Sequence, residues 1–447
     1  MRSAASGHRF LPLPSKFLSR MAEAIPKASH TDKHIGQLAN SIRNFGFNVP
    51  VLIDDNSQVI AGHGRVLACR LLGMREVPTI RLEHLSEQQK QAFVLADNRL
   101  AEVSEWDEKL LGEQLKILSE AELNFSLEVT GFEMGEIDLY IENLDPTIDG
   151  ENDPADALPE ASSVRVSRLG DLWKLGEHRV LCGNALAAAA YRQLMNDRKA
   201  DVIFTDPPYN VRISGHVSGN GKASHREFVM ASGEMSEPEF TRFLTDGLSL
   251  MAEHSAKGSL HYICMDWRHL PELLSAGRVA YSQLKNVCVW VKDNAGMGSF
   301  YRSQHELVCV FENGKGRYRN NVQLGRFGRS RSNVWNYPGA NSFSRNSGEG
   351  DLLALHPTVK PVALVADAIM DCSARGDLVL DPFLGSGTTV IASERTGRVC
   401  HGMELDPIYV DTLVRRWERF TGLEAVHEAT GHTFAQQERE AIDGCEQ

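Results

Sequence analysis

Apolar positions in the first third of the chain follow a helical spacing in some segments and a strand-like spacing in others. Ile35, Leu38, Ala39 and Ile42 recur at the i, i+3, i+4, i+7 positions of an amphipathic helix, and Gly46 follows its expected end. The same patterns predict strands at 49–53, 59–61 and 77–82 and helices at 66–72, 86–100 and 107–143. We therefore expect a small α+β domain in this part of the chain.

Strand-like apolar runs alternate with helical stretches in the rest of the chain. The runs lie at 202–205, 259–264, 286–291, 307–311, 378–380 and 398–403. Alternation of this kind predicts an α/β fold with an open, mostly parallel sheet. Ligands of such sheets bind beyond the carboxyl ends of the strands, so distinctive residues at those ends are the first candidates for a functional site.

A change of composition separates the two parts. Residues 145–160 contain six acidic residues, three prolines and no basic residue, which is typical of a solvated linker. We expect five segments in all: a flexible tail (1–30), an N-terminal domain with a helical extension (31–144), an acidic linker (145–165), a second domain (166–425) and a polar C-terminal tail (426–447).

Charge and cysteine usage narrow the class of protein. The net charge of −12 argues against a protein that binds nucleic acid with its whole surface, so any contact with phosphates must be local. The eight cysteines form no C-x-x-C pair, which predicts neither a zinc ribbon nor a disulfide scaffold and fits a reducing cytoplasm. The apolar runs stay well below the roughly 20 residues that a bilayer requires, so we expect no membrane span.

The most distinctive motif is Asp206-Pro207-Pro208-Tyr209, directly after the apolar run at 202–205. Two prolines in succession make a rigid turn, so a carboxylate and a proline carbonyl can accept hydrogen bonds from the same amino group. Those bonds favour a tetrahedral nitrogen whose lone pair can attack a sulfonium methyl group. Tyr209 would stack on a base that has left the duplex. The alternative is an ordinary surface turn at a strand end.

A second motif, Asp381 to Thr389, connects the run at 378–380 to a helix expected from about Val390. Its glycines, Gly385 and Gly387, would let the backbone approach a ligand, and a helix N-terminus favours a carboxylate. The next strand ends at Glu404, where an acid can bind ribose hydroxyls. No Gly-Lys-Ser/Thr follows, so a phosphate-binding loop is disfavoured; a structural turn is the other alternative.

Together these motifs resemble the amino-methyltransferases of DNA, in the β-type order in which the catalytic tetrapeptide precedes the cofactor loop. The resemblance covers residues 166–422 and includes the segments 356–361 and 402–409. It implies a Rossmann-like sheet and transfer of a methyl group from S-adenosylmethionine to an exocyclic amine of a base in double-stranded DNA, with the base flipped out of the duplex. No metal is expected to take part.

The resemblance also implies where the cofactor binds. It places Thr358 and Lys360 at the methionine end, Asp381 at the methionine amino group, Phe383 beside the cofactor, Gly385, Gly387 and Thr388 in the loop, and Glu404 at the ribose. One position departs from the family pattern, because Asn184 stands where the family usually has Asp. The contact to the cofactor's adenine would then come from an amide, which both donates and accepts.

The identity of the target base is less firmly indicated. In this family an Asp at the first position of the tetrapeptide usually accompanies adenine N6 methylation, whereas Ser is more common in cytosine N4 enzymes. Asp206 therefore favours adenine. A cytosine N4 methyltransferase and a noncatalytic DNA-binding protein with a vestigial enzyme domain are the alternatives, although the intact motifs argue against the second.

A basic stretch suggests where DNA would bind. Residues 313–345 contain no acidic residue, and aromatic residues are interleaved with their basic side chains. Arginine reads guanine edges or binds phosphate, so we predict a target-recognition region at 313–355. Its candidate DNA contacts are Arg317, Arg319, Arg326, Arg329 and Arg331. The alternative is a solvated basic loop. The polar segment 210–232 could close over the flipped base.

The N-terminal domain carries Gly62-His63-Gly64-Arg65 between a strand and a helix, where backbone amides can receive an anion. With the segments 48–53 and 96–99 it resembles the ParB/sulfiredoxin-like domain over residues 31–103. The resemblance implies CTP or ATP binding as one hypothesis and a scaffold or DNA-positioning role as the other. A second copy of the chain and a cognate restriction endonuclease are further candidate partners.

Overall fold

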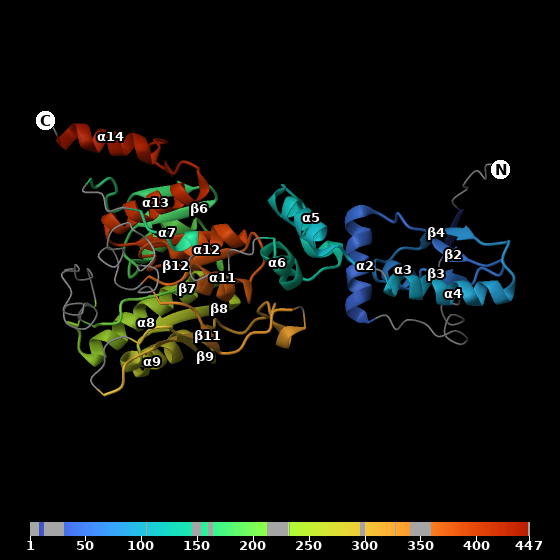
Figure 1. Cartoon of the computed structure of the whole chain (residues 1–447), viewed down its shortest axis with the longest axis horizontal. Helices are drawn as coiled ribbons and strands as arrows, with labels where there is room; N and C mark the ends of the chain where they lie inside the picture. The colour runs from blue at the N-terminus through green and yellow to red at the C-terminus, as the bar shows by residue number, and fades with distance from the viewer. Residues whose placement is uncertain are drawn as a thin grey trace. The chain divides into compact units, whose positions relative to one another are not determined.

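A computed structural model of the chain describes residues 9–12, 31–103, 105–144, 153–159, 164–211, 231, 233–295, 300–326, 328–339 and 359–445. The chain divides into two compact units, Met1–Leu144 and Asp145–Gln447 (Figure 1). In the described part of the chain, no helix combines the length and the apolar character needed to cross a bilayer.

The N-terminal unit is built on a four-stranded sheet in the order β1-β4-β2-β3. Its elements are β1 (Arg9–Pro12), α2 (Asp32–Phe45), β2 (Val51–Ile53), β3 (Val59–Ala61), α3 (His63–Leu71), β4 (Glu76–Arg81), α4 (Glu87–Glu102), α5 (Glu108–Glu120), the 3-10 helix η2 (Leu127–Thr130) and α6 (Met134–Glu142). The hydroxyl of Thr31 caps α2, and Ser86 forms a capping box with Gln89 at the start of α4. The three expected strands and the first three expected helices are confirmed. The helix expected over 107–143 is divided into α5, η2 and α6, and β1 was not predicted.

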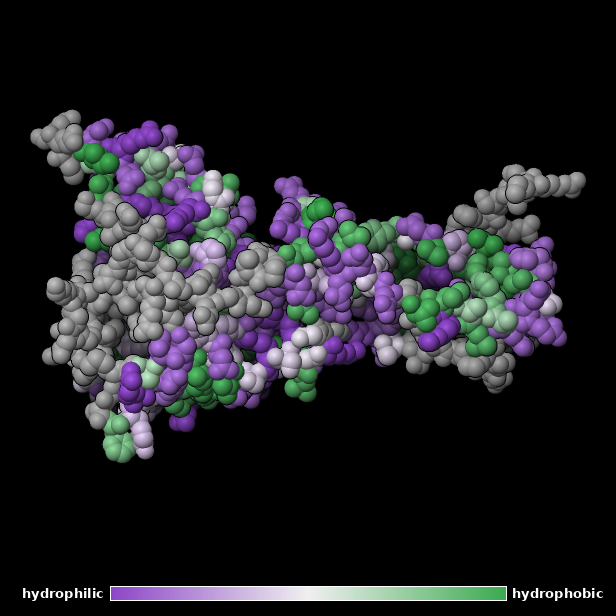
Figure 2. Space-filling model, viewed as in Figure 1, coloured by the Kyte–Doolittle hydropathy of each residue, from purple (hydrophilic) through white to green (hydrophobic). Residues whose placement is uncertain are grey.

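Hydrophobic side chains lie on the surface of this unit as well as in its core. Figure 2 shows hydrophobic surface, in green, over the strands and over α4, where Ile80, Leu95 and Leu100 are exposed. The core itself is small, with Val51 and Val66 at its centre. The unit therefore presents apolar as well as charged surface to its surroundings.

The second unit is built on a ten-stranded sheet in the order β11-β9-β10-β8-β7-β12-β13-β6-β5-β14. The strands are β5 (Leu172–Leu175), β6 (His178–Cys182), β7 (Ala200–Thr205), β8 (Ser255–Met265), β9 (Gln283–Val291), β10 (His305–Glu312), β11 (Val334–Asn336), β12 (Leu378–Asp381), β13 (Val399–Glu404) and β14 (Val426–His427). The central strands β8, β7, β12, β13 and β6 are parallel, whereas β10 runs antiparallel to β8 and β9. The expected parallel block is present, within a mixed sheet.

Helices cover both faces of this sheet (Figure 1). They are α7 (Ala188–Met195), α8 (Glu237–Glu253), α9 (Leu270–Ala280), α11 (Val362–Met370), α12 (Thr388–Thr396), α13 (Pro407–Thr421) and α14 (Phe434–Cys445). Side chains alternate along each strand, so Val202 and Phe204 pack in the core with α11, α12 and α13, while Ile203 packs in the core with α7, α8 and α9. Both faces of the central strands are therefore buried.

Two segments that composition predicts to be solvated are packed in the structure. The acidic linker contains a 3-10 helix, η4 (Pro154–Asp156), in which Ala155 and Asp156 are buried. The polar C-terminal tail contributes β14, which pairs with β5, and α14, whose Phe434 is 1% exposed. The predictions of a solvated linker and tail are wrong at these positions, because the acidic side chains find buried partners and the tail contains an apolar anchor.

Candidate active site

The sheet brings the two predicted motifs together at one edge. Asp206 follows β7 and Asp381 ends β12, and these neighbouring parallel strands pair through Val202 and Val379. The hydroxyl of Thr205 donates a hydrogen bond of 2.7 Å to the Asp381 carboxylate. The site is therefore assembled at the carboxyl ends of parallel strands, as the α/β pattern predicts.

Glu404 and Asn184 complete this edge. Glu404 ends β13 and Asn184 follows β6, and these are the next two strands beyond β12. The backbone N–H of Gly183 donates to the Glu404 carbonyl over 2.9 Å, so Asn184 begins beside the end of β13. Its side-chain oxygen accepts from the N–H of Leu186 over 2.9 Å.

Two residues of the tetrapeptide, Asp206 and Tyr209, belong to a cluster of five polar and charged side chains. The phenol of Tyr209 donates to Oδ1 of Asp206 over 2.5 Å, and the ammonium of Lys360 donates to Oδ2 over 2.5 Å. The same ammonium lies 3.0 Å from Oε2 of Glu306, whose Oε1 lies 2.5 Å from Nζ of Lys292. Sequence analysis did not identify Glu306 or Lys292 because neither belongs to a recognisable motif.

The strand directions explain why these groups meet. β9 runs parallel to β11 and antiparallel to β10, with Trp290 opposite Glu306. The end of β9, where Lys292 follows, and the start of β10 therefore lie at the same edge of the sheet as the carboxyl end of β7. An alternating apolar pattern predicts that these segments are strands. It does not tell which polar residues at the strand ends lie close together in the sheet.

Burial and neighbouring charges shift the pKa values of Asp206 and Glu306 in opposite directions. Burial raises the pKa of Asp206 above its usual range, and repulsion by Glu306 adds to this, while Lys360 acts in the opposite direction. Burial would also raise the pKa of Glu306, but the ammonium groups of Lys360 and Lys292 hold it well below the usual range. Asp206 is therefore the more basic carboxylate of the two.

The cofactor loop is held by carboxylates at both sides. Asp381 accepts from the hydroxyls of Thr205 and Thr389 and from the N–H of Phe383. Glu404 accepts from the N–H of Gly385 over 2.9 Å. Burial raises the pKa of Asp381 to about 6 and that of Glu404 to about 7, so both acids are poised to respond to a ligand that carries a cation or donates hydroxyl protons.

Gly387 is required for packing within the protein. It caps α12 with a φ of 84°, and a Cβ at this position would lie 2.5 Å from Cγ of Leu413. Close packing between α13 and the loop therefore excludes a side chain, whereas the sequence motif was interpreted as making room for a ligand. Gly385 also has a positive φ, at 51°.

Thr388 connects the loop to the segment that carries Lys360. Its hydroxyl donates to the carbonyl oxygen of Lys360 over 3.3 Å and accepts from Arg416 over 3.2 Å. Arg416 is buried and also donates to the carbonyls of Ser386 and Ala155. The guanidinium of Arg416 thus connects the cofactor loop to the segment 145–165, which was predicted to be a linker and is called the former linker below.

The former linker makes two further contacts with the catalytic unit. Arg395 donates to both oxygens of Asp153, each over 2.6 Å. Asp156 accepts from the N–H of Val362 over 2.8 Å, two residues after Lys360. Burial raises the pKa of Asp156 to about 6.

The structure changes the interpretation of two other predicted cofactor residues. The Lys360 side chain lies in the Asp206 cluster, and only its backbone carbonyl contacts the loop. The half-buried ring of Phe383 lies 6.3 Å from that of Phe243 in α8. Thr358 lies outside the described residues.

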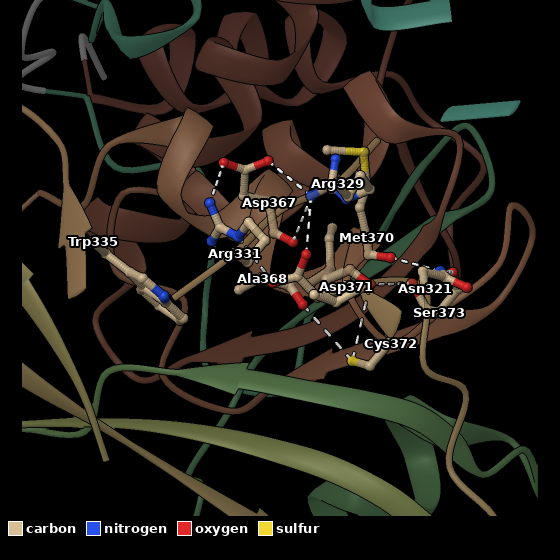
Figure 3. Close-up of polar contacts among 12 residues, drawn as sticks. Asn321, Arg329, Arg331, Trp335, Asp367, Ala368, Met370, Asp371, Cys372 and Ser373 are labelled. Carbon is tan, nitrogen blue, oxygen red and sulfur yellow. Dashed lines mark hydrogen bonds and ion pairs between the residues drawn. The ribbon is translucent and has the colours of Figure 1, made fainter. Parts of the chain in front are cut away.

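The guanidinium groups of Arg329 and Arg331, which were predicted to contact DNA, pair with carboxylates in the structure. Figure 3 shows both side chains directed at Asp367 and Asp371 of the α11 segment. Arg329 donates to these carboxylates over 2.9 and 3.0 Å, and Arg331 over 2.7 and 3.1 Å. These acidic partners lie about forty positions away in the sequence, outside the basic stretch, and contact of this pair with DNA stays a prediction.

Other residues of the predicted target-recognition region are likewise partly buried and partly exposed. Trp335, one of the aromatic residues interleaved with the basic side chains, is buried and packs in the core, and its indole N–H donates to the Ser332 carbonyl. Arg317 and Arg326 are exposed, and Arg319 is half-buried. The predicted DNA contacts of these three arginines stay predictions, as does the closing role of 210–232, most of which lies outside the described residues.

The glycine motif of the N-terminal unit adopts the expected position between β3 and α3. Gly62 caps α3 in the left-handed conformation, with a φ of 99°. Arg65 donates to the carbonyl of Val49 over 2.8 Å and thereby links the helix to the segment entering β2. Binding of an anion or nucleotide by Gly62, His63, Gly64 and Arg65 stays a prediction.

Within the described residues, no group of three or more His, Cys, Asp or Glu side chains has an arrangement that could hold a metal ion. The acids and glycines at the loop fit S-adenosylmethionine instead. Glu404 would accept from ribose hydroxyls, and Asp381 would face the methionine amino group. The loop at Gly385 has the backbone conformation that close approach requires.

Comparison with known families gives the class of this fold and site: residues 200–415 match the model of the DNA methylase family that acts on N6 and N4 amino groups. Residues 18–99 match the ParB N-terminal domain, and residues 109–169 match the ParB-methyltransferase helix-turn-helix domain. The chain therefore contains an N6/N4 DNA methylase domain, with ParB-type domains on its N-terminal side. The sequence predicted the helices α5 and α6 but not their helix-turn-helix character.

Two curated relatives match different parts of the chain. The ParB-like nuclease domain-containing protein YnaK of Escherichia coli (strain K12) is 48% identical over 63 residues, covering 14% of this chain and 72% of the relative. The type II methyltransferase M.HpaI of Haemophilus parainfluenzae is 23% identical over 267 residues, covering 56% of this chain and 78% of the relative. Each relative thus corresponds to one of the two parts.

Solved structures of methyltransferases also match the second part. A complex of M1.HpyAVI with S-adenosylmethionine has a TM-score of 0.39 and 21% identity, covering 53% of this chain and 97% of that structure. The cytosine-N4-specific PvuII DNA methyltransferase has a TM-score of 0.40 and 14% identity, covering 64% and 97%.

Proposed function

We propose that this protein is a site-specific DNA methyltransferase that transfers a methyl group from S-adenosylmethionine to N6 of adenine. The observation that carries the proposal is the geometry at Asp206. Its half-buried carboxylate accepts a hydrogen bond from a nitrogen, the ammonium of Lys360, over 2.5 Å. A carboxylate placed in this way is suited to accept an N–H from an exocyclic amine.

The residues of the tetrapeptide account for the chemistry. S-Adenosylmethionine supplies an electrophilic methyl group on a sulfonium. Asp206 and the carbonyl of Pro207 would accept the two N–H bonds of the amine and turn its lone pair toward the methyl group. The N–CH3 bond forms as the S–CH3 bond breaks, and the amine proton passes to Asp206, the more basic carboxylate of the cluster.

Tyr209 is suited to hold the flipped base. Its phenol donates to Asp206, which fixes the ring beside the acceptor carboxylate. An aromatic ring in this position can stack on a base that has left the duplex. The rigid Pro207-Pro208 segment keeps the ring and carboxylate in register.

Adenine is preferred to cytosine because the tetrapeptide begins with Asp206, the residue that usually accompanies N6 methylation in the family. Cytosine N4 remains the alternative target. Recognition of the DNA would come from the exposed arginines of 313–355 and from the helix-turn-helix region, which would compensate locally for the acidic net charge.

Expression in methylation-deficient cells, followed by single-molecule sequencing of their DNA, tests the proposal. Adenine should be modified at one short recurrent sequence in cells that carry the wild-type chain and at none in cells that carry Asp206→Ala. Modified cytosine would overturn the base assignment. Absence of modification at good expression would favour the noncatalytic alternative.

A further inference from the structure

The acceptor site contains more charge than methyl transfer by the tetrapeptide requires. Two carboxylates, Asp206 and Glu306, share the ammonium of Lys360, which is 5% exposed. Glu306 is bound in addition by Lys292. Neither β9 nor β10, the strands that supply Lys292 and Glu306, carries either sequence motif, so these residues need an explanation of their own.

Both oxygens of the catalytic carboxylate already have donors. Oδ1 of Asp206 accepts from the phenol of Tyr209, and Oδ2 accepts from Lys360. In the proposed reaction the amine of the target base donates to Asp206, so it must replace one of these two donors. Oε2 of Glu306 lies 3.1 Å from the Tyr209 phenol and 3.0 Å from the Lys360 nitrogen, so both donors have a second acceptor. The ammonium of Lys360 has three N–H donors and the phenol has one, so Lys360 can bind Glu306 before it leaves Oδ2.

We propose that Lys360 occupies the position on Asp206 that the target amine takes in the reaction, and that Glu306 is a positioning residue, which retains the Lys360 ammonium when that amine binds Asp206. This inference rests on the proposed function and assigns a role to a residue outside both motifs. When the target base binds, the Lys360 ammonium would move from Asp206 to Glu306, and the Asp206 carboxylate could then accept a hydrogen bond from the amine of the base.

Charge balance supports this assignment. The cluster holds two carboxylates and two ammonium groups, and the incoming amine is neutral. An unpaired ammonium at this depth would be strongly unfavourable, so Lys360 needs a counter-ion throughout the reaction. The pKa of Glu306 is held low by two lysines, so Glu306 stays ionised while Asp206 takes up the proton from the methylated amine.

The surrounding aromatic rings also favour a retained cation. The nitrogen of Lys360 lies 5.6 Å from the ring centroid of Tyr209 and 5.7 Å from that of Trp290. Lys292 lies 4.5 Å from the same Trp290 ring, and Trp290 is paired with Glu306 across the sheet. The lysine can therefore move between the carboxylates while it stays beside aromatic faces.

The chain offers a closely matched control at the other end of β10. Glu312 lies 3.2 Å from Lys285, and the exposed fractions of its side chain and of its lysine, 12% and 27%, equal those of Glu306 and Lys292. Glu306→Gln and Glu312→Gln therefore make the same change on one strand, and only the first touches the acceptor cluster.

The experiment measures methylation of unmodified DNA by the full-length variants, together with S-adenosylmethionine affinity by calorimetry and folding by circular dichroism. We expect Glu306→Gln to raise KM for DNA and lower kcat/KM by about tenfold or more, because Lys360 then pairs with Asp206 alone. Cofactor affinity should stay within about twofold. Glu312→Gln should match the wild type in all three measurements.

The double variant Glu306→Gln/Lys360→Met supplies the decisive comparison. It removes the ammonium together with its counter-ion, so kcat/KM should rise at least about threefold above that of Glu306→Gln alone, a non-additivity that a merely structural role would not give. Wild-type kinetics in Glu306→Gln, or no recovery in the double variant, would overturn this inference and leave the proposed function intact. No methyl transfer by the wild-type protein would overturn both.

Discussion

Lys360 places its ammonium nitrogen 2.5 Å from Oδ2 of Asp206, a residue 154 positions earlier in the chain. The backbone carbonyl of the same lysine accepts from Thr388 in the cofactor loop. One residue thus contacts the group that would receive the target amine and the loop that would hold the methyl donor. This connection shows how a segment between two motifs can take part in the site.

Arg329 is expected to stabilise the fold rather than contact DNA. Its side chain is 5% exposed and paired with Asp367 and Asp371. Arg329→Met should lower the free energy of unfolding of the catalytic unit by about 3 kcal/mol, because the buried carboxylate of Asp371 and the half-buried one of Asp367 lose a partner. Denaturant unfolding followed by tryptophan fluorescence measures this.

Arg317 gives the contrasting expectation, because its side chain is exposed. Arg317→Gln should leave stability within about 0.5 kcal/mol and reduce the slope of log K for DNA against log salt by about one. A steep salt dependence that is unchanged in Arg317→Gln would place the phosphate contact elsewhere. Unimpaired stability in Arg329→Met would contradict the structural role of that arginine.

Arg416 is expected to set the affinity for the cofactor from behind the loop. Its guanidinium donates to Ser386 and Thr388 on one side and to Ala155 on the other. Arg416→Met should weaken S-adenosylmethionine binding by about tenfold, because a charge-assisted anchor of the loop is lost. Isothermal titration calorimetry of the folded variant measures the change.

Arg395→Met is the control for this prediction. Arg395 binds Asp153 in the same former linker but makes no hydrogen bond to the loop residues in the described structure. Equal loss of cofactor affinity in the Arg395 and Arg416 variants would mean that the whole segment, rather than the loop anchor, controls binding.

We expect the affinity for S-adenosylmethionine to depend on pH because of Glu404. Burial raises its pKa from an ordinary value near 4.5 to about 7, so in the free protein the carboxylate is protonated as pH falls through 7. Hydroxyl donation by ribose requires the ionised form, so affinity should decrease below pH 7, by at most about tenfold per unit. Asp381, with a pKa of about 6, would contribute only at lower pH.

The same raised pKa has the opposite consequence for the stability of the free protein. The stabilising contribution of protonated Glu404 is complete below about pH 4.5 and is lost as pH rises through 7. Glu404→Gln should remove both effects between pH 6.5 and 8.5. A pH dependence that persists unchanged in this variant would show that another group titrates.

Gly387→Ala should destabilise the catalytic unit by about 1–3 kcal/mol, because its Cβ would lie 2.5 Å from Cγ of Leu413. Gly422→Ala is the control, since Gly422 has a similar φ of 74° but nothing within 4 Å of an added Cβ. Thermal unfolding compares the two. A Gly387→Ala variant no less stable than Gly422→Ala would contradict the packing argument.

The sequence could predict what depends on local pattern. Strands β7, β12 and β13 follow from apolar runs, and the motifs at Asp206 and Asp381 follow from their position after those runs. Because the carboxyl ends of parallel strands lie at one edge, the approach of the two motifs was predictable as well.

The rest depends on partners far away in the chain. An arginine that binds phosphate and an arginine that binds a buried carboxylate have the same local sequence, so Arg331 could not be assigned before Asp367 was placed beside it. Acidic composition in the former linker was misleading for the same reason, since the partner of Asp153 is Arg395, 242 positions later. Glu306 belongs to no motif. Its place in the site became clear only from the antiparallel direction of β10 in the sheet.

Mass spectrometry of nucleosides from DNA incubated with the purified chain and labelled S-adenosylmethionine tests the central claim most directly. We predict N6-methyladenine as the labelled product of the wild-type chain, and none from Asp206→Ala even though that variant still binds the cofactor. Labelled N4-methylcytosine, or N6-methyladenine formed at the wild-type rate by Asp206→Ala, would contradict the account.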